Sequence, residues 1–167
     1  MATVMHSIRT AVYALRFAAA IKLHGILALF IAALLHDIGK SKVPGSILNK
    51  PGKLTADEMA VMKGHAGNGA DMLEGKLPPI IVGMIRYHHE NVDGTGYYGV
   101  QDIPVGARII RICDVYDSLT SRRPYKEPWT REQALRYLLE NTGTLFDTAL
   151  TAAFVRSRLE GMEIARA

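Results

Sequence analysis

The chain has 167 residues, with 20 Lys+Arg against 16 Asp+Glu and a formal net charge of +4. A chain of this length supports one hydrophobic core, so we expect a single domain over residues 1–167. Hydrophobic residues at 49% and charged residues at 22% exclude a disordered or collagen-like chain. The single cysteine, Cys113, excludes an intrachain disulfide framework and indicates a reducing compartment. The mild positive charge suits an anionic ligand but does not indicate binding to a nucleic-acid polymer.

The N-terminal third is apolar, but its longest uninterrupted apolar run, Ile26–Leu35, has only 10 residues. A helix that spans a bilayer needs about 20 predominantly apolar residues. No small-residue cleavage site follows a signal-like segment either. We therefore expect a buried helix here, no membrane span, and a cytoplasmic protein.

Helical periodicity dominates the sequence and strand signals are scarce. The predicted helices cover, in chain order, residues 1–22, 26–37, 55–73, 78–90, 104–120, 130–143 and 148–164. Residues 41–54 and 91–101 are predicted loops, because they are rich in Gly and Pro. The apolar stripe of the first helix is predicted to comprise Val12, Leu15, Ala19 and Leu23.

Two capping boxes, at 55–58 and 130–133, mark helix starts. Pro79 and Pro104 mark two more, since proline is favoured in the first helical turn. We see no internal repeat or interdomain linker. The sequence therefore predicts an all-α fold, a single bundle of six or seven helices.

Polar side chains fall on the inward faces of four predicted helices. They are His36–Asp37, His65, His88 and Asp114, each three to seven residues from apolar companions. A buried carboxylate costs several kcal/mol unless it is paired or bound to metal. His and Asp suit Fe, Mn or Zn, whereas the absence of cysteine pairs excludes a thiolate zinc site. A lone inward histidine is more often a hydrogen-bonded core residue, but the joint pattern favours a metal site in the interior of the bundle.

Lys40 lies four residues after His36 and three after Asp37. If helical geometry continues, its ammonium lies beside the metal site, where it can neutralise a phosphate oxygen. The alternative is a lysine favoured by the macrodipole at a helix C-terminus. His24 has no such companions and is predicted to be a surface or turn residue.

His36-Asp-Ile-Gly-Lys40 resembles the HDIGK motif of the HD superfamily of metal-dependent phosphohydrolases. His88-His-Glu-Asn-Val-Asp-Gly-Thr-Gly-Tyr-Tyr98 resembles the HHE..DG.GYP signature of its HD-GYP subfamily. The ordered resemblance extends from His6 to about Phe154. It implies a bacterial phosphodiesterase of cyclic di-GMP, which yields pGpG and, in many members, GMP.

The resemblance also implies the roles of individual residues. The implied metal ligands are His6, His36, Asp37, His65, His88, His89 and Asp114. Asp37 would bridge two divalent ions, with Fe and Mn typical of the family, and a hydroxide bridging the metals would attack phosphorus. Lys40 would assist at the phosphate, and the loop from Gly94 to Tyr98, which includes Tyr97, would border the substrate groove. Arg123 and Lys126 resemble the family's phosphate and guanine contacts, although Arg123 also fits an ordinary surface arginine.

The sequence departs from the family pattern at three points. Tyr98 stands where the signature has proline, and the loop that follows is shorter than usual. Ala2 stands where some members carry a glutamate for a third metal, so we expect two metals. These departures leave a second function open, a catalytically weak cyclic-dinucleotide receptor or protein-interaction scaffold. A third function, an HD hydrolase of another nucleotide, is disfavoured by the HHE..DG segment. The expected partner is a second copy of this chain or a signalling protein.

Overall fold

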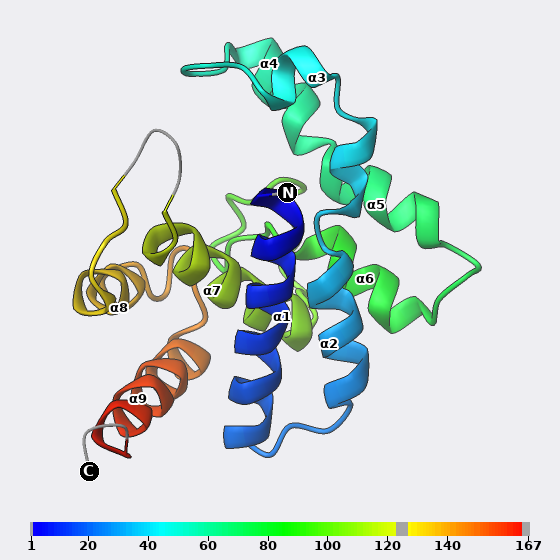
Figure 1. The fold of residues 1–167 in the computed structure, drawn as a ribbon. Helices are drawn as coiled ribbons and strands as arrows, with labels where there is room; N and C mark the ends of the chain where they lie inside the picture. The colour runs from blue at the N-terminus through cyan, green and yellow to red at the C-terminus, as the bar shows by residue number, and fades with distance from the viewer. Residues whose placement is uncertain (1, 123–126, 165–167) are drawn as a thin grey trace.

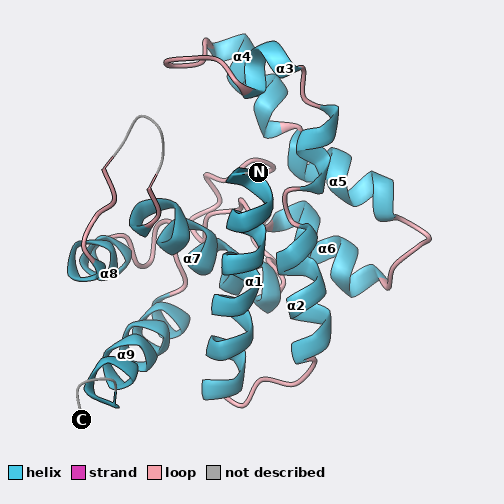
Figure 2. Ribbon diagram, viewed as in Figure 1, coloured by secondary structure: helices cyan, strands magenta, loops and turns pink. Residues whose placement is uncertain are grey.

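The computed structural model describes residues 2–122 and 127–164, and within them the chain is all-α (Figures 1 and 2). The elements are α1 (Ala2–Ala20), α2 (Ile26–Leu35), the 3-10 helix η1 (Ile38–Lys42), α3 (Gly45–Leu48), α4 (Ala56–Lys63), α5 (His65–Leu73), α6 (Pro79–Tyr87), α7 (Val105–Thr120), α8 (Arg131–Glu140) and α9 (Thr148–Ile164). The described residues contain no strand, only one isolated bridge between Thr142 and Phe146. The predicted fold class is confirmed.

Helices α1 and α2 run side by side in opposite directions at the centre of the bundle (Figure 1). A turn joins them at Gly25, whose φ of 76° lies in the left-handed region that favours glycine. Helix α7 packs against α1, and α6 packs against α2. Helices α3 and α4 project from one end, whereas α8 and α9 lie on the other side of the bundle (Figure 1). These contacts join α1, α2, α6 and α7 in one bundle, and α5 packs against α6 and η1.

The buried face of α1 is not the predicted stripe. Ala11, Ala14 and Phe17 are buried, whereas Leu15 is 37% exposed and Ala19 is also exposed. Small alanine side chains allow α2 to approach α1 closely, and the bulkier leucine is left outside that contact. The prediction therefore identified the helix but rotated its inward face.

Several predicted boundaries were also wrong. The helix predicted over 55–73 breaks at Gly64 into α4 and α5, and the loop predicted over 41–54 contains the end of η1 and the short α3. The described chain therefore has more helices than the six or seven expected. The second helix ends at Leu35 rather than Asp37, and the chain tightens into η1.

The local start signals were correct. Thr55 Oγ1 accepts from the Glu58 amide at 3.3 Å while the Thr55 amide donates to the Glu58 carboxylate at 2.8 Å, and Thr130 forms the same box with Gln133. Pro79 and Pro104 likewise stand at the starts of α6 and α7. Among the described helices, none combines the length and the apolar character needed to cross a bilayer.

Candidate metal centre

The centre begins where α2 gives way to η1. His36 and Asp37 occupy this junction and are buried, at 0% and 5% exposure. Gly39 lets η1 lie directly against the backbone of α5, because a Cβ at this position would fall 2.0 Å from the His65 carbonyl oxygen. This close approach places Asp37 Oδ1 3.4 Å from His65 Nε2.

Three buried imidazoles are oriented in the same way by the backbone. Nδ1 of His36, His65 and His88 lies 2.7, 2.7 and 2.6 Å from the carbonyl oxygen three residues earlier, to which it donates. A neutral imidazole with its proton on Nδ1 offers the Nε2 lone pair as a ligand. In each ring Nε2 is buried and has no hydrogen-bond partner. Buried polar atoms are normally paired, so these three fit a cation rather than a hydrogen-bonded core.

The ligand-type residues fall into two adjacent groups. His6, His36 and Asp37 form one, and His65, His88 and His89 form the other, with one ligand atom per residue within 4.8 Å of the rest. The Asp37 carboxylate lies between the groups, because Oδ2 is 3.5 Å from His36 Nε2 and Oδ1 faces His65. Imidazole and carboxylate donors suit Fe, Mn or Zn. The structure thus brings together residues that could hold metal.

His6 reaches the centre from the N-terminal turn of α1 and contacts two carboxylates of α7. Its Nε2 lies 2.9 Å from Asp114 Oδ1, and its Nδ1 lies 2.7 Å from Asp117 Oδ2. Burial alone would lower the pKa of His6, but hydrogen bonds to Asp114 and Asp117 raise it to about 9. Asp114, the remaining predicted ligand, is therefore hydrogen-bonded to His6, which is itself a predicted metal ligand.

A side chain that the sequence prediction missed supports this arrangement. Arg9 donates to both oxygens of Asp117, from Nε at 2.6 Å and from Nη2 at 3.0 Å. Asp117 in turn fixes the ring of His6 through Nδ1. The signal available in the sequence was spacing alone, since Arg9 lies one helical turn after His6 and Asp117 lies one turn after Asp114.

Lys40 lies where the sequence placed it. Its Nζ is 2.6 Å from Asp37 Oδ2, and its side chain is 27% exposed. The ammonium therefore lies at the edge of the centre, where it contacts both Asp37 and solvent. Burial would raise the pKa of Asp37, but His36 and Lys40 lower it. Asp37 is therefore a carboxylate at neutral pH.

The two adjacent histidines at the end of α6 are neutral. Burial, with the nearby His36 and His65, lowers the pKa of His88 to about 3. Burial and the neighbouring His88 also lower the pKa of His89 well below its ordinary value. Metal ions bind the neutral imidazole, so both rings carry the net charge that ligation requires.

The loop after α6 is organised by Glu90, whose role the sequence prediction missed. Its two carboxylate oxygens accept from the amides of Tyr98 and Val100, at 2.8 and 2.9 Å. Proline has no backbone N–H, so the tyrosine at position 98 supplies the first of these bonds. Gly94 turns this loop with φ 81°, and the Tyr97 ring lies 4.6 Å from that of His89.

A groove opens onto the centre at Asp37 and Lys40. It has a volume of about 440 Å³, and its walls include Val4, Leu34 and Leu48. These apolar side chains are 62%, 36% and 38% exposed. The groove can receive a ligand with an anionic part at Lys40 and an apolar or planar part along its walls.

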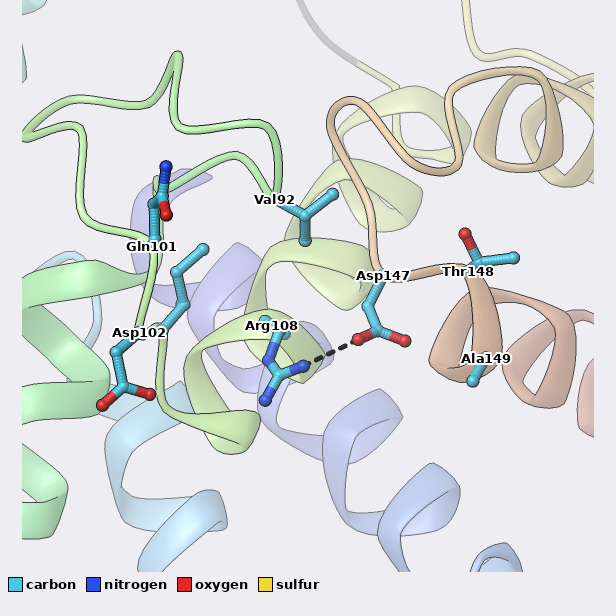
Figure 3. A pocket seen from close by; sticks show the side chains of 8 residues that line it. Val92, Gln101, Asp102, Arg108, Asp147, Thr148 and Ala149 are labelled. Atoms are coloured by element: carbon cyan, nitrogen blue, oxygen red, sulfur yellow. Dashed lines mark hydrogen bonds and ion pairs between the residues drawn. The ribbon is translucent and has the colours of Figure 1, made fainter.

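A second hollow is separate from the centre. It lies between the loop and the start of α9, where Arg108 donates to Asp147 at 2.7 Å (Figure 3). The positive charge of Arg108 and the negative charge of Asp147 thus neutralise each other in this hollow. The other predicted substrate contacts, Arg123 and Lys126, lie outside the described residues.

Comparisons with known proteins agree with this geometry. A family model described as the HD domain matches residues 4–150. The chain is 48% identical over 136 residues to the cyclic di-GMP phosphodiesterase response regulator RpfG of Xanthomonas campestris, a match that covers 78% of this chain and 36% of RpfG. It is 46% identical over 132 residues to a cyclic di-GMP phosphodiesterase of Pseudomonas aeruginosa, covering 76% and 32%.

A solved structure has the same fold. An HDG"Y"P protein from Bdellovibrio bacteriovorus superposes with a TM-score of 0.74 at 19% identity, over 92% of this chain and 51% of that one. The chain spans about a third of the length of the curated relatives it matches, 36% and 32%.

Proposed function

The chain belongs to the HD domain family, and from this premise we propose that it is a metal-dependent phosphodiesterase that hydrolyses cyclic di-GMP to pGpG and onward to GMP. The observation that carries the proposal is the set of unpartnered, buried Nε2 atoms on His36, His65 and His88. The first two face Asp37, and the His88 ring lies 5.1 Å from that of His36 and 5.4 Å from that of His65. A scaffold has no need for three buried imidazole nitrogens without partners. The HD-GYP resemblance agrees with relatives that are named cyclic di-GMP phosphodiesterases.

We propose two divalent ions, Fe or Mn, in this centre. The residues that would hold them are His6, His36, Asp37, His65, His88, His89 and Asp114. When bound, such ions activate water and offset the charge of a phosphate. Coordination by His6 would replace its bond to Asp114, which is itself a carboxylate able to ligate.

The chain's own residues bind and orient the substrate in this proposal. Each phosphodiester of a cyclic dinucleotide carries one negative charge, and the Lys40 ammonium lies at the groove beside Asp37. The apolar walls of the groove suit the face of a base. Tyr97 lies beside His89 at the centre, and Gly94 stays a predicted substrate contact. Arg123 and Lys126 stay predicted contacts to phosphate and guanine. A homodimer or a signalling partner also stays a prediction.

The test is a direct assay with a metal count. The protein is purified without oxygen, its metals are quantified, and it is incubated with cyclic di-GMP while products are separated by chromatography. We expect pGpG and then GMP, and we expect Asp37→Ala to lose both tight metal and turnover while the helical circular dichroism is kept. Asp102→Ala, on an exposed loop position, is the matched control and should behave as the wild type.

Two results would redirect the proposal. Two bound metals without turnover, with Mn or Fe supplied, would support a cyclic-dinucleotide receptor or scaffold instead. Preferential cleavage of a hybrid cyclic GMP–AMP would keep the reaction and change the substrate. Unaltered metal content in Asp37→Ala would reject the site.

A further inference from the structure

One histidine of the centre is held differently from the others. Arg111 Nη1 lies 3.2 Å from His89 Nδ1. A guanidinium carries donors only, so Nδ1 of His89 accepts this hydrogen bond and the proton of the neutral ring is on Nε2. His36, His65 and His88 carry their protons on Nδ1 instead, as donors to backbone carbonyls. Three rings are therefore ready to ligate through Nε2, and the fourth is not.

Arg111 is fixed in place by its surroundings. It lies on α7 one turn before Asp114, and its Nη2 donates to Asn91 Oδ1 at 3.1 Å. The guanidinium also lies over the Phe146 ring, 5.9 Å from its centroid. Its Nε is buried without a hydrogen-bond partner. These contacts distinguish it from a solvated surface arginine and aim it at His89.

Ligation by His89 is incompatible with this hydrogen bond. A metal on Nε2 requires the ring proton on Nδ1, where it would face the N–H of Arg111. A metal on Nδ1 would take the place of Arg111 itself. In either case the hydrogen bond to Arg111 is lost, and the guanidinium charge opposes a cation at the same position.

We propose that Arg111 limits divalent-metal binding at the position formed by His65, His88 and His89, and that its guanidinium must withdraw from His89 before that position fills. The inference rests on the proposed two-metal centre. Because Arg111 also holds Asn91, at the start of the loop, filling this position would also release one contact of the loop that carries Tyr97 beside His89. Arg111 is thus a positioning residue that acts through His89.

The test compares Arg111→Met with Arg108→Met. Methionine keeps an unbranched stem without donors or charge, and Arg108 lies one turn earlier on α7, bonded to Asp147 rather than to the histidines. Chelator-stripped proteins are titrated with Mn²⁺, and bound ion is measured by electron paramagnetic resonance. We expect Arg111→Met to tighten one of two sites by about tenfold or more, the scale of changes next to metal-ligating histidines, and to leave the other unchanged. Arg108→Met should match the wild type at both sites.

A second readout separates the hydrogen bond from the charge. Nitrogen-15 NMR of the metal-free imidazoles should show His89 with its proton on Nε2 in the wild type, and the proton on Nδ1 in His36, His65 and His88. A His89 proton on Nδ1 in the wild type would overturn the proposed mechanism even if Arg111→Met bound metal more tightly. Unchanged or weaker Mn²⁺ binding in Arg111→Met would overturn the inference alone. Failure of the wild type to bind Mn²⁺ would overturn the two-metal centre and the inference together.

Discussion

Gly39 is the position where one added methyl group would damage the centre most directly. An alanine Cβ there would meet the His65 carbonyl oxygen at 2.0 Å, the Gly69 amide nitrogen at 2.4 Å and the Gly69 Cα at 2.9 Å. Ordinary contact begins near 3.4 Å, so η1 and α5 must separate by more than 1 Å. All three obstructing atoms are backbone, and no side chain can rotate away.

The structure sets the size of the expected effect. Forcing an extra methyl group into a packed site costs about 1–3 kcal/mol, and the backbone obstruction places Gly39→Ala at about 3 kcal/mol or more. A domain has about 5–15 kcal/mol of stability, so the variant still folds. The same displacement separates Asp37 from His65, and metal–ligand distances tolerate only about 0.2 Å. We therefore expect weaker metal binding as well as lower stability.

The assay is urea unfolding followed by circular dichroism, together with elemental analysis of bound metal. Gly83→Ala is the matched control, because its Cβ would meet only Pro104 Cγ at 4.0 Å, inside α6. Replacing glycine by alanine within a helix is worth about 0.5–1 kcal/mol, so this control should be slightly more stable than the wild type. A Gly39→Ala protein within about 0.5 kcal/mol of the wild type, with full metal content, would refute the reasoning.

Two further predictions concern the groove and the loop. Lys40→Met should keep its bound metal yet lower turnover of cyclic di-GMP by about 10²–10³, the loss expected for one electrostatic stabiliser; chromatographic rates equal to the wild type would contradict its role at the phosphate. Glu90→Gln should speed hydrogen exchange at the amides of Tyr98 and Val100 by about tenfold or more, since a hydrogen bond to a charged group contributes about 1.5–3 kcal/mol. Unchanged protection of both amides would show that Glu90 does not organise the loop.

Local signals in the sequence were sufficient for the starts of four helices, α4, α6, α7 and α8. The capping boxes at Thr55 and Thr130, and the prolines that start α6 and α7, act within one helical turn. Their physical cause lies in neighbouring residues, so the chain reports it directly. The break at Gly64 and the rotated face of α1 were not predicted, because both depend on which helix packs alongside.

The sequence also indicated which residue types form the centre. Residue type and spacing indicate metal chemistry here, through adjacent pairs such as His36–Asp37 and His88–His89 and single inward residues elsewhere. The structure brings these side chains together in two groups that share the Asp37 carboxylate. Arg123 and Lys126 stay predictions on motif alone.

Tertiary structure decided the hydrogen bonds that hold the rings of His6 and His89. The bond between His6 and Asp117 joins residues 111 positions apart, and the one between Arg111 and His89 joins residues 22 apart. The sequence determined which side chains could bind metal, because ligand chemistry belongs to the residue type. The rings of His36, His65 and His88 are oriented by carbonyl oxygens three residues earlier, which is a local effect. The packing of α7 against α1 and α6 determined the ring partners of His6 and His89, because those partners come from another helix.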